Sequence, residues 1–199
     1  MKILAFSDVH VSQKHCRRIV EMSQHVDLVI GAGDFGNIGG GLRRSIGWLK
    51  AIEKPAVLVP GNSERFDELQ DACQEWPCST VLHGTETEAL GVHIYGVGGG
   101  IPVTPFGPKS FDFTEDEARN LLRNCPHDGI LVTHSPPKGI LDISSSGMSL
   151  GSEAIREVIF KRKPKLLICG HIHESSGREQ ITDQTRVINA GPRGIIVDL

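Results

Sequence analysis

Short apolar runs alternate with helical patterns along most of the chain. The runs are bounded by Gly, Pro or Asp and lack polar alternation, which is typical of strands covered on both faces. The predicted strands are residues 3–6, 28–30, 56–59, 130–132 and 166–169. Between them, apolar residues recur at helical spacing. The predicted helices are residues 13–25, 42–53, 65–75, 114–123 and 152–161.

The fourth predicted helix carries its own start and stop signals. Thr114 is followed three residues later by Glu117, which is the spacing of a capping box, and Pro126 lies beyond the helix end. Further strands are predicted around Val81 and at residues 92–97, 186–188 and 195–197. We expect short turns to join the C-terminal strands into a β meander.

Alternating strands and helices predict parallel pairing, while the meander predicts antiparallel additions. We therefore predict an α/β fold in which two mixed β-sheets pack as a sandwich flanked by α-helices, giving four layers (αββα). The length of 199 residues is typical of one domain, so we expect residues 1–199 to form a single domain.

Composition narrows the possible partners and location. The net charge is −3, so no basic field favours nucleic acid. The five cysteines are odd in number and lack CxxC pairs, which favours packing roles in a reducing compartment. The apolar run at residues 3–6 is too short for a signal-peptide core, and the sequence contains no membrane span. We expect a cytoplasmic protein without membrane association.

Five polar clusters directly follow apolar runs. They are Asp8-Val9-His10, Gly33-Asp34, Gly61-Asn62, Thr133-His134 and Gly170-His171-Ile172-His173. Ligands bind beyond the carboxyl ends of the strands in open α/β sheets, so the clusters are predicted to meet at one edge. One such histidine or Gly-Asp pair alone would indicate only a structural residue or a turn. Five in succession favour a shared site.

The local geometry of each cluster can be predicted. In an extended segment, residues two apart face the same way, so Asp8 and His10 could reach one ion. His171 and His173 repeat this spacing, with Ile172 packing inward. A Gly-Ala-Gly turn precedes Asp34 and allows close backbone approach. The two carboxylate oxygens of Asp34 could bridge two cations.

The donor set indicates the metal and the reaction. Two carboxylates, one amide and four imidazoles suit Mn, Fe, Zn, Ni or Co, and do not suit Ca or Mg cages. Seven donors are more than one ion needs. Two such ions about 3.5–4 Å apart can clamp the attacking and leaving oxygens at phosphorus and activate water. The sequence therefore predicts phosphoester hydrolysis.

The ordered motifs SDVH, GDFGN, GNSE, THSPP and GHIHE resemble the calcineurin-like metallophosphoesterase superfamily. They span residues 7–174, and the turn at Asn189-Ala190-Gly191 extends the resemblance. The segment 133–177 is similar to the small phosphodiesterase-like branch that includes the mammalian metallophosphoesterase-domain proteins. The resemblance implies the two-sheet fold and a pair of divalent transition-metal ions, with Mn favoured.

The resemblance also implies a role for each motif residue. It assigns the ligands to two ions: Asp8, His10 and His173 to one, and Asn62, His134 and His171 to the other. Asp34 would bridge both ions, and a bridging hydroxide would be the nucleophile. The implied catalytic residues are Asp34, Asn62 and His134.

Two positions depart from the family pattern. Many members carry His after the motif Asn, where it is thought to protonate the leaving group or bind phosphate, but this chain has Ser63. A hydroxyl can contact a phosphate oxygen but is a poor acid near neutral pH, so Ser63 and Asn62 are expected to bind substrate. How the leaving group is protonated stays open. Gly36 replaces an acidic or Asn residue, and Asn37 is expected to support a ligand.

Other polar residues near the motifs have weaker signals. Glu64 is expected to orient a ligating imidazole, with a solvent-facing position as the alternative. Lys138 and Arg65 could supply positive charge to a phosphate, but both are interpreted as solvated surface. The histidines outside the motifs are interpreted as surface or hydrogen-bonded structural residues: His15, His25, His83, His93 and His127. The irregular segment 98–113 is expected either to border the substrate entrance or to be a surface excursion.

These observations favour a dinuclear metallophosphoesterase that acts on a small phosphate ester, with diesters preferred over monoesters, as a monomer or small homo-oligomer. One alternative is a metal-poor protein-interaction scaffold of the same fold, which would retain no metal. Another is a nuclease, but such enzymes of this superfamily are longer and carry an added DNA-facing domain, and this chain lacks a basic field. The natural substrate and the physiological metal are not indicated.

Overall fold

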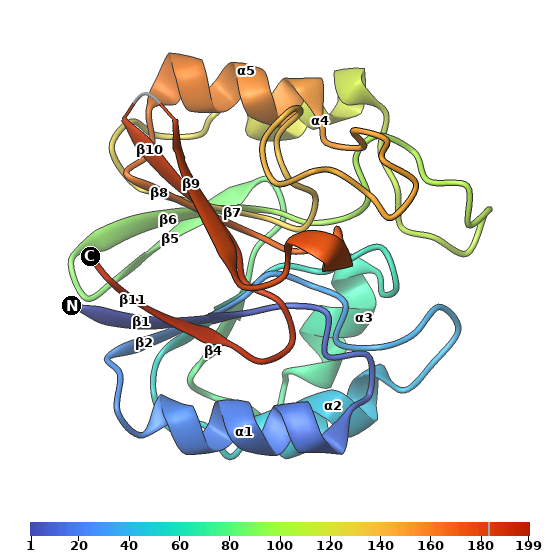
Figure 1. The fold of residues 1–199 in the computed structure, drawn as a ribbon. Helices are drawn as coiled ribbons and strands as arrows, with labels where there is room; N and C mark the ends of the chain where they lie inside the picture. Colours follow the sequence, from blue (N-terminus) through green and yellow to red (C-terminus); the bar gives the residue numbers. More distant parts are fainter. Residues whose placement is uncertain (183) are drawn as a thin grey trace.

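Two β-sheets lie face to face between two layers of helices in the computed structural model, which describes residues 1–182 and 184–199 (Figure 1). The first sheet contains, in spatial order, β11 (Ile195–Asp198), β1 (Lys2–Phe6), β2 (Leu28–Gly31), β3 (Ala56–Leu58) and β4 (Ser79–Val81). Strands β1 to β4 are parallel, and β11 pairs antiparallel with β1 at one edge.

The second sheet has a parallel centre with an antiparallel strand at each edge. It contains, in spatial order, β5 (Thr85–Ala89), β6 (Val92–Val97), β7 (Ile130–Thr133), β8 (Leu166–Cys169), β10 (Thr185–Asn189) and β9 (Arg178–Thr182). The edge strands β5 and β9 pair antiparallel with β6 and β10. Both sheets are therefore mixed, as predicted.

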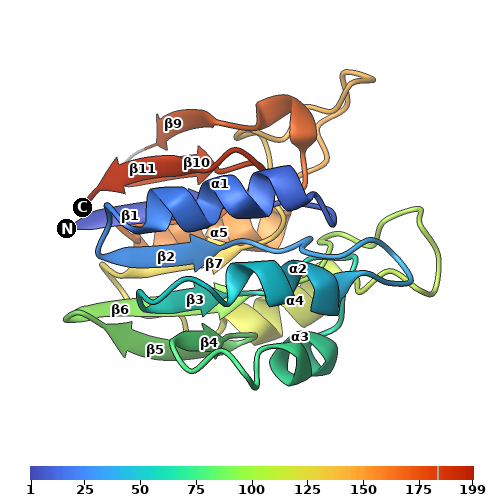
Figure 2. The ribbon, with the colours of Figure 1, turned by 90° about the horizontal axis from the view of Figure 1, so that it is seen from below.

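The helices cover the outer faces of the two sheets. On the first sheet lie α1 (Gln13–Ser23), α2 (Leu42–Leu49) and α3 (Phe66–Ala72), as Figure 2 shows from below. On the second sheet lie α4 (Glu115–Leu122) and α5 (Glu153–Arg162). A short 3₁₀ helix, η1 (His173–Ser175), follows β8. The four-layer prediction is confirmed.

Alternation within the strands explains this layering. In β1, Ile3 and Ala5 face the core between the two sheets, while Leu4 and Phe6 face the core beneath α1, α2 and α3. A third buried cluster lies between the second sheet and its helices. Burying each large apolar side chain contributes roughly 1.5–3 kcal/mol, so strands that are apolar on both faces are held in the middle of the molecule.

Most predicted elements are present, and four of the five predicted helices are shorter than expected. Thr114 caps α4 as predicted: the Glu117 backbone N–H donates to Thr114 Oγ1 (3.3 Å), and Glu117 Oε2 accepts the Thr114 N–H (2.8 Å). The predicted C-terminal meander is wrong, because β10 and β11 belong to different sheets. Strands β5 and β9 were not predicted, since both are polar edge strands without an apolar run.

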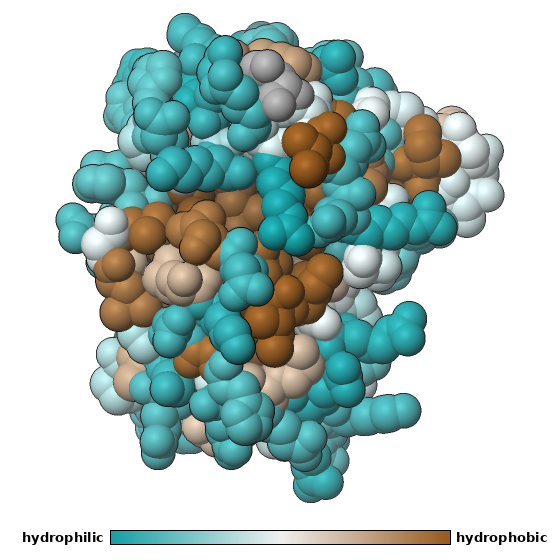
Figure 3. Space-filling view, turned by 60° about the vertical axis from the view of Figure 1, so that its left-hand side comes forward, coloured by the Kyte–Doolittle hydropathy of each residue, from teal (hydrophilic) through white to brown (hydrophobic). Residues whose placement is uncertain are grey.

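The edge strands β9 and β11, at the front of Figure 1, expose Ile181 and Ile196. In the space-filling view, apolar side chains are visible between hydrophilic ones (Figure 3). All five cysteines are free thiols, and four of them are buried. In residues 1–182 and 184–199, we find no helix with the length and apolar character needed to cross a membrane.

His83 is one of the histidines interpreted as structural, and it packs inside an aromatic cluster. Its ring centroid lies 5.0 Å from that of Phe113 and 5.3 Å from that of Phe111. Its Nδ1 accepts the Gly98 backbone N–H at 3.2 Å. Burial lowers the pKa of His83 to about 4, because the surroundings solvate the imidazolium poorly.

This shifted pKa predicts a pH dependence of stability. In the unfolded chain His83 is protonated below its ordinary pKa of 6.5, whereas in the folded protein it is protonated only below about 4. The contribution of His83 to stability is therefore complete above pH 6.5 and is lost as the pH falls toward 4. Between pH 7 and pH 5 we expect His83 to account for a loss of about 1–2 kcal/mol. Urea unfolding at both pH values checks this: the His83→Gln variant should lose correspondingly less, and an identical loss would contradict the assignment.

Candidate metal centre

The loops that follow β1, β2, β3, β7 and β8 leave the sheets at the same end of the sandwich, on the right in Figure 1. These loops carry all seven predicted ligand side chains. Three of the strands belong to the first sheet and two to the second. The site therefore lies where the ends of the two sheets face each other.

The first group of donor atoms comes from Asp8, His10 and His173. One ligand atom from each residue lies within 4.8 Å of the others. The Nε2 atoms of His10 and His173 are 3.3 Å apart, and Nε2 of His173 lies 3.5 Å from Asp8 Oδ1. Asp8 is buried, while the His173 side chain is 58% exposed, so this group opens to solvent.

The second group is more deeply placed. Ligand atoms of Asp8, Asp34 and His134 lie within 4.8 Å of one another, and all three residues are buried. Nε2 of His134 is 3.2 Å from Asn62 Oδ1 and 3.5 Å from Asp34 Oδ1. The other oxygen of Asp34, Oδ2, lies 3.5 Å from His10 Nε2. The carboxylate of Asp34 therefore faces both groups, one oxygen toward each.

His171 completes the set. Its ring packs edge-on against His134, with centroids 4.9 Å apart, and its backbone N–H donates to Asp8 Oδ1 at 3.1 Å. The structure thus brings together all seven predicted ligands of the five sequence clusters.

The extended geometry predicted for the Asp8–His10 and His171–His173 clusters is wrong. Asp8 and His10 have φ angles of +55° and +42°, and Asp34 and His171 have φ angles of +56° and +67°. These values lie in the left-handed region, which is sparsely populated by residues other than Gly and is common at functional sites. The donors converge because the chain turns sharply at each one. Ile172 is buried as predicted.

Backbone hydrogen bonds hold these turns against each other. The Asp8 N–H donates to Gly33 O (2.9 Å), and the His10 N–H donates to Asp34 O (3.1 Å). Glycine is required where the loops touch, because a Cβ on Gly61 would lie 2.2 Å from the Asp34 backbone nitrogen. The turns are therefore fixed by contact between loops.

Hydrogen bonds also set the orientation of two imidazoles. Nδ1 of His10 lies 3.0 Å from Gly36 O, and Nδ1 of His134 lies 2.8 Å from Ala32 O. Because a carbonyl only accepts, each Nδ1 must carry the proton and donate it. In the neutral ring, the lone pair is then on Nε2, which faces the cluster. This tautomer suits metal binding through Nε2.

The electrostatics follow from burial and mutual contact. Burial would raise the pKa of Asp8, but a hydrogen bond with His173 and the nearby charge of His134 outweigh it and lower the pKa to about 2. Burial would lower the pKa of His134, yet Asp34 and Asp8 outweigh it and raise the pKa. Burial and the neighbouring His134 lower the pKa of His171 to about 4. The centre combines an ionised carboxylate with an imidazole held neutral.

Glu64 binds backbone rather than an imidazole, so that prediction is wrong. Its buried carboxylate accepts N–H groups from Gly61 (2.8 Å), Gly36 (3.0 Å) and Phe35 (3.3 Å). Burial and the charge of Asp34 raise the pKa of Glu64 to about 7. Glu64 thereby ties the loop of Asp34 to the loop of Asn62.

Asn189 is a supporting residue whose role was not predicted. It is buried, and its Nδ2 donates to Gly170 O (3.0 Å) and Ile172 O (2.9 Å), which fixes the loop of His171 and His173. The available signal was an amide at the end of an apolar strand, where a buried polar group needs partners.

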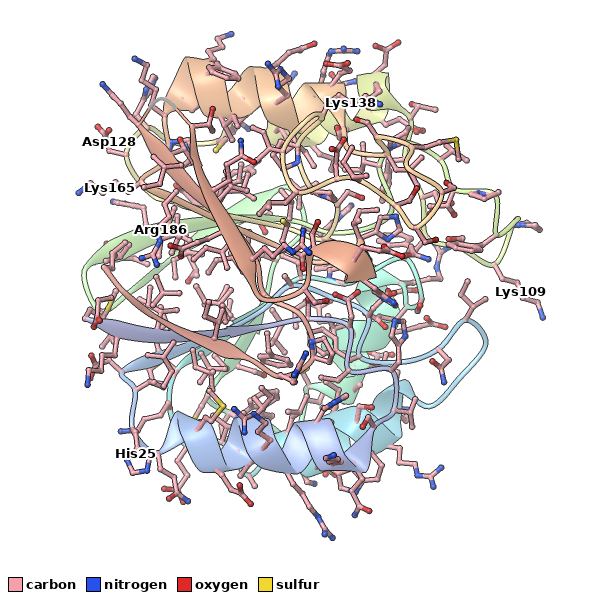
Figure 4. The ribbon with its side chains drawn as sticks, viewed as in Figure 1. His25, Lys109, Asp128, Lys138, Lys165 and Arg186 are labelled. Atoms are coloured by element: carbon pink, nitrogen blue, oxygen red, sulfur yellow. The ribbon has the colours of Figure 1, made fainter. Side chains whose placement is uncertain are left out.

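The remaining predicted residues lie around the centre. The Ser63 N–H donates to Asp34 Oδ1 (2.9 Å), and Asn37 is exposed and pairs with Gly40 through backbone atoms. Arg65 is exposed beside Asp67. Lys138, labelled in Figure 4 near α5, is half-buried, and its Nζ donates to Ser149 O (2.6 Å), so it is not free surface.

A cavity of about 550 Å³ opens over the centre. Five of the predicted ligands line it: His10, Asp34, Asn62, His171 and His173. Residues 102–106 form another part of its wall, which places segment 98–113 beside the centre. This segment is tied to Asn62, since Asn62 Nδ2 donates to Ser110 Oγ (3.1 Å) and the Phe111 N–H donates to Asn62 O (2.9 Å).

Comparison with known proteins identifies one family model and several relatives. The family model for calcineurin-like phosphoesterase matches residues 1–175. The chain is 35% identical over 103 residues to UPF0046 protein T07D4.2 of Caenorhabditis elegans, covering 48% of this chain and 24% of that protein. It is 22% identical over 160 residues to a probable cyclic nucleotide phosphodiesterase of Synechococcus, covering 75% and 58%. The chain therefore spans less than two thirds of either relative.

Solved structures share the fold. TT1561 of Thermus thermophilus superposes with a TM-score of 0.77 at 17% identity, covering 96% of this chain and 88% of that one. A dimetal phosphatase from Danio rerio superposes with a TM-score of 0.61 at 12% identity, covering 95% and 86%. At these identities the likeness establishes the architecture alone.

Proposed function

Since this chain belongs to the calcineurin-like phosphoesterase family, we propose that it is a metal-dependent phosphohydrolase that cleaves phosphodiesters with two divalent cations. The observation that carries the proposal is the position of Asp34, whose Oδ2 lies 3.5 Å from His10 Nε2 and whose Oδ1 lies 3.5 Å from His134 Nε2. One carboxylate can thus serve two neighbouring cation sites.

The proposed ligands divide between the sites. Asp8, His10 and His173 would hold one ion, Asn62, His134 and His171 would hold the other, and Asp34 would contact both. The fit is supported by the protons on Nδ1 of His10 and His134, which leave Nε2 of both rings available. Mixed nitrogen and oxygen donors suit Mn, Fe, Zn, Ni or Co, and we propose Mn.

When bound, two such cations would supply hydroxide at neutral pH and neutralise charge that develops on the phosphoryl oxygens. The catalytic contributions of the chain would come from Asp34, Asn62 and His134, which fix the reacting groups in place. Asn62 and Ser63 would contact the substrate phosphate. Ser63 is a poor acid, so esters whose alcohol group can leave without being protonated should react best.

We further propose that residues 1–199 act as one catalytic domain, as a monomer or small homo-oligomer. Pairing of β1 with β11 supports the single domain, because it joins strands from opposite ends of this range in one sheet. Five free thiols support a reducing compartment, such as the cytoplasm. The convergence of seven donors favours an enzyme over a metal-poor scaffold, and the net charge of −3 does not favour a nuclease.

Diesters should be preferred over monoesters. Among the described residues, no Lys or Arg lines the cavity over the centre, so the second negative charge of a monoester has no partner besides the ions. With Mn, we expect kcat/KM for bis-p-nitrophenyl phosphate to exceed that for p-nitrophenyl phosphate by at least about tenfold, roughly 1.4 kcal/mol. Ser63→His should reduce this difference in kcat/KM, because a histidine can pair with the second charge of a monoester and can protonate its leaving group. Equal or faster monoester turnover by the unmodified protein would rule the preference out.

A further inference from the structure

One wall of the cavity over the metal centre is apolar. We call it the apolar wall and define it as the large hydrophobic side chains that line this cavity and are exposed to solvent: Ile38, Val103, Phe106 and Leu150. Val103 and Phe106 are each 59% exposed. Single exposed apolar residues are ordinary, but a group of them beside polar ligands is typical of a binding site.

The apolar wall is assembled from distant parts of the chain. Ile38 follows β2, Val103 and Phe106 follow β6, and Leu150 precedes α5. These loops meet only because the strand ends converge, and at the same place they meet the ligands His10 and His173. A phosphate held at the centre would therefore have its ester groups within reach of this wall.

Among the described residues that line the cavity, no Lys or Arg side chain is present to pair with an anionic ester group. In the described part of the chain, the one charged lining residue besides the predicted ligands is Glu174. Basic side chains lie instead in a second cavity, of about 790 Å³, which shares Asn37 and Ser63 with the first. Its lining is polar and of mixed charge, with four basic residues (Arg43, Arg44, Arg65 and Lys109) and three acidic ones (Glu64, Glu68 and Asp71). A polar ester group would thus lie in the second cavity, and an apolar ester group would lie against the apolar wall.

Internal hydrogen bonds hold the loops of the apolar wall in place. Asp112 accepts from the Thr104 N–H (2.9 Å) and from Ser110 Oγ (2.8 Å), which closes the loop of Val103 and Phe106. Asp142 accepts from the Gly139 N–H (2.9 Å) and the Gly151 N–H (3.0 Å), which closes the loop of Leu150. A wall fixed before binding loses little entropy when a ligand arrives.

From these observations we infer that the apolar wall binds a hydrocarbon or aryl ester group of the substrate, so that the enzyme acts on phosphodiesters with at least one apolar alcohol. The inference rests on the proposed function, because the phosphate must first be held at the metal centre. It assigns to Ile38, Val103, Phe106 and Leu150 a role in choosing the substrate.

Binding of alkylphosphonates to the Mn-loaded protein tests the inference without turnover. Their alkyl chain is attached by a C–P bond that phosphoester hydrolysis does not break. The difference in Kd between two chain lengths, measured by calorimetry, therefore reports how the chain interacts. Each buried methylene is worth roughly a fourfold change in Kd, and the cavity is open on one side. We therefore expect hexylphosphonate to bind roughly 10- to 100-fold more tightly than methylphosphonate.

Variants locate the effect. Phe106→Ser and Val103→Ser should each reduce the hexyl-to-methyl ratio of affinities by roughly threefold or more. The matched control is Ile181→Ser, because Ile181 is 72% exposed on the edge strand β9 and lies outside the cavity. This control should keep the full ratio. A loss of the ratio in Ile181→Ser, or a full ratio in both wall variants, would overturn the inference.

The outcomes separate this inference from the proposed function. If the protein retains no Mn and binds neither phosphonate, the proposed metal centre is wrong. If methylphosphonate binds and hexylphosphonate binds no more tightly, the centre stands and the apolar wall is wrong. Sedimentation with phosphatidylcholine vesicles distinguishes two sources of such an ester: co-sedimentation supports a membrane lipid, and its absence supports a small ester in solution.

Discussion

Asp34→Ala is expected to abolish phosphodiester hydrolysis and to loosen both proposed ions. The two oxygens of Asp34 face imidazoles of different groups, at 3.5 Å from His10 Nε2 and 3.5 Å from His134 Nε2. Metal stabilisation of the transition state is worth several kcal/mol, and about 4 kcal/mol corresponds to a thousandfold in rate. We therefore expect at least a loss of that size in kcat/KM, with metal content measured on the same sample.

Asp128→Ala is the matched control. Asp34 and Asp128 have nearly the same left-handed backbone, with φ angles of +56° and +59°, so Ala introduces similar strain at both. Asp128 is exposed just before β7, at the end of the sandwich opposite the metal centre (Figure 4). Asn62→Ala should weaken mainly one ion. Near-normal turnover and full metal content in Asp34→Ala would show that Asp34 bridges nothing.

The convergence of the seven ligands could be predicted because it depends on topology. Each cluster follows an apolar run, and parallel strands bring such positions to one end regardless of local detail. The layers could be predicted for the same reason, since β1 and β2 are apolar on both faces. The edge strands could not be predicted. A segment such as Thr85–Ala89 is polar, and it forms a strand only because it pairs with β6.

The geometry of the ligands could not be predicted from their spacing. Residues two apart suggest an extended segment, yet Asp8, His10 and His171 all have left-handed backbone. That conformation is unfavourable locally and persists because bonds from another loop, such as His10 N–H to Asp34 O, fix it. Such bonds join residues far apart in the chain, so no local pattern records them.

The roles of the supporting residues could not be predicted from the sequence for a related reason. Asn189 and Glu64 bind backbone atoms rather than ligand side chains, so the ligand spacing of the motifs does not indicate their roles. Glu64 was singled out for its place beside Asn62, but its partners Gly36 and Phe35 come from a different loop. The apolar wall could not be predicted either, because Ile38 and Leu150 are far apart in the sequence and line one cavity only in the folded protein.

Glu64→Ala is expected to destabilise the whole fold. The buried carboxylate accepts three backbone N–H groups, from Gly61, Gly36 and Phe35. Each buried donor left without a partner costs about 1–3 kcal/mol, so we expect a loss of about 3–9 kcal/mol in the free energy of unfolding. Because small proteins have only about 5–15 kcal/mol in total, the variant should unfold at much lower urea concentration. Glu64→Gln keeps one acceptor oxygen and should lose less.

Glu68→Ala serves as the control for this loss. Glu68 is exposed on α3, four residues from Glu64, and accepts a single backbone N–H, that of Arg65 (2.9 Å). Its removal should cost only about 0.5–1 kcal/mol, because water can replace the carboxylate. Equal losses in Glu64→Ala and Glu68→Ala would show that the loops of Asp34 and Asn62 hold together without Glu64. A larger loss in Glu64→Ala, accompanied by weaker Mn retention, would show that one buried carboxylate couples the stability of the fold to the geometry of its metal centre.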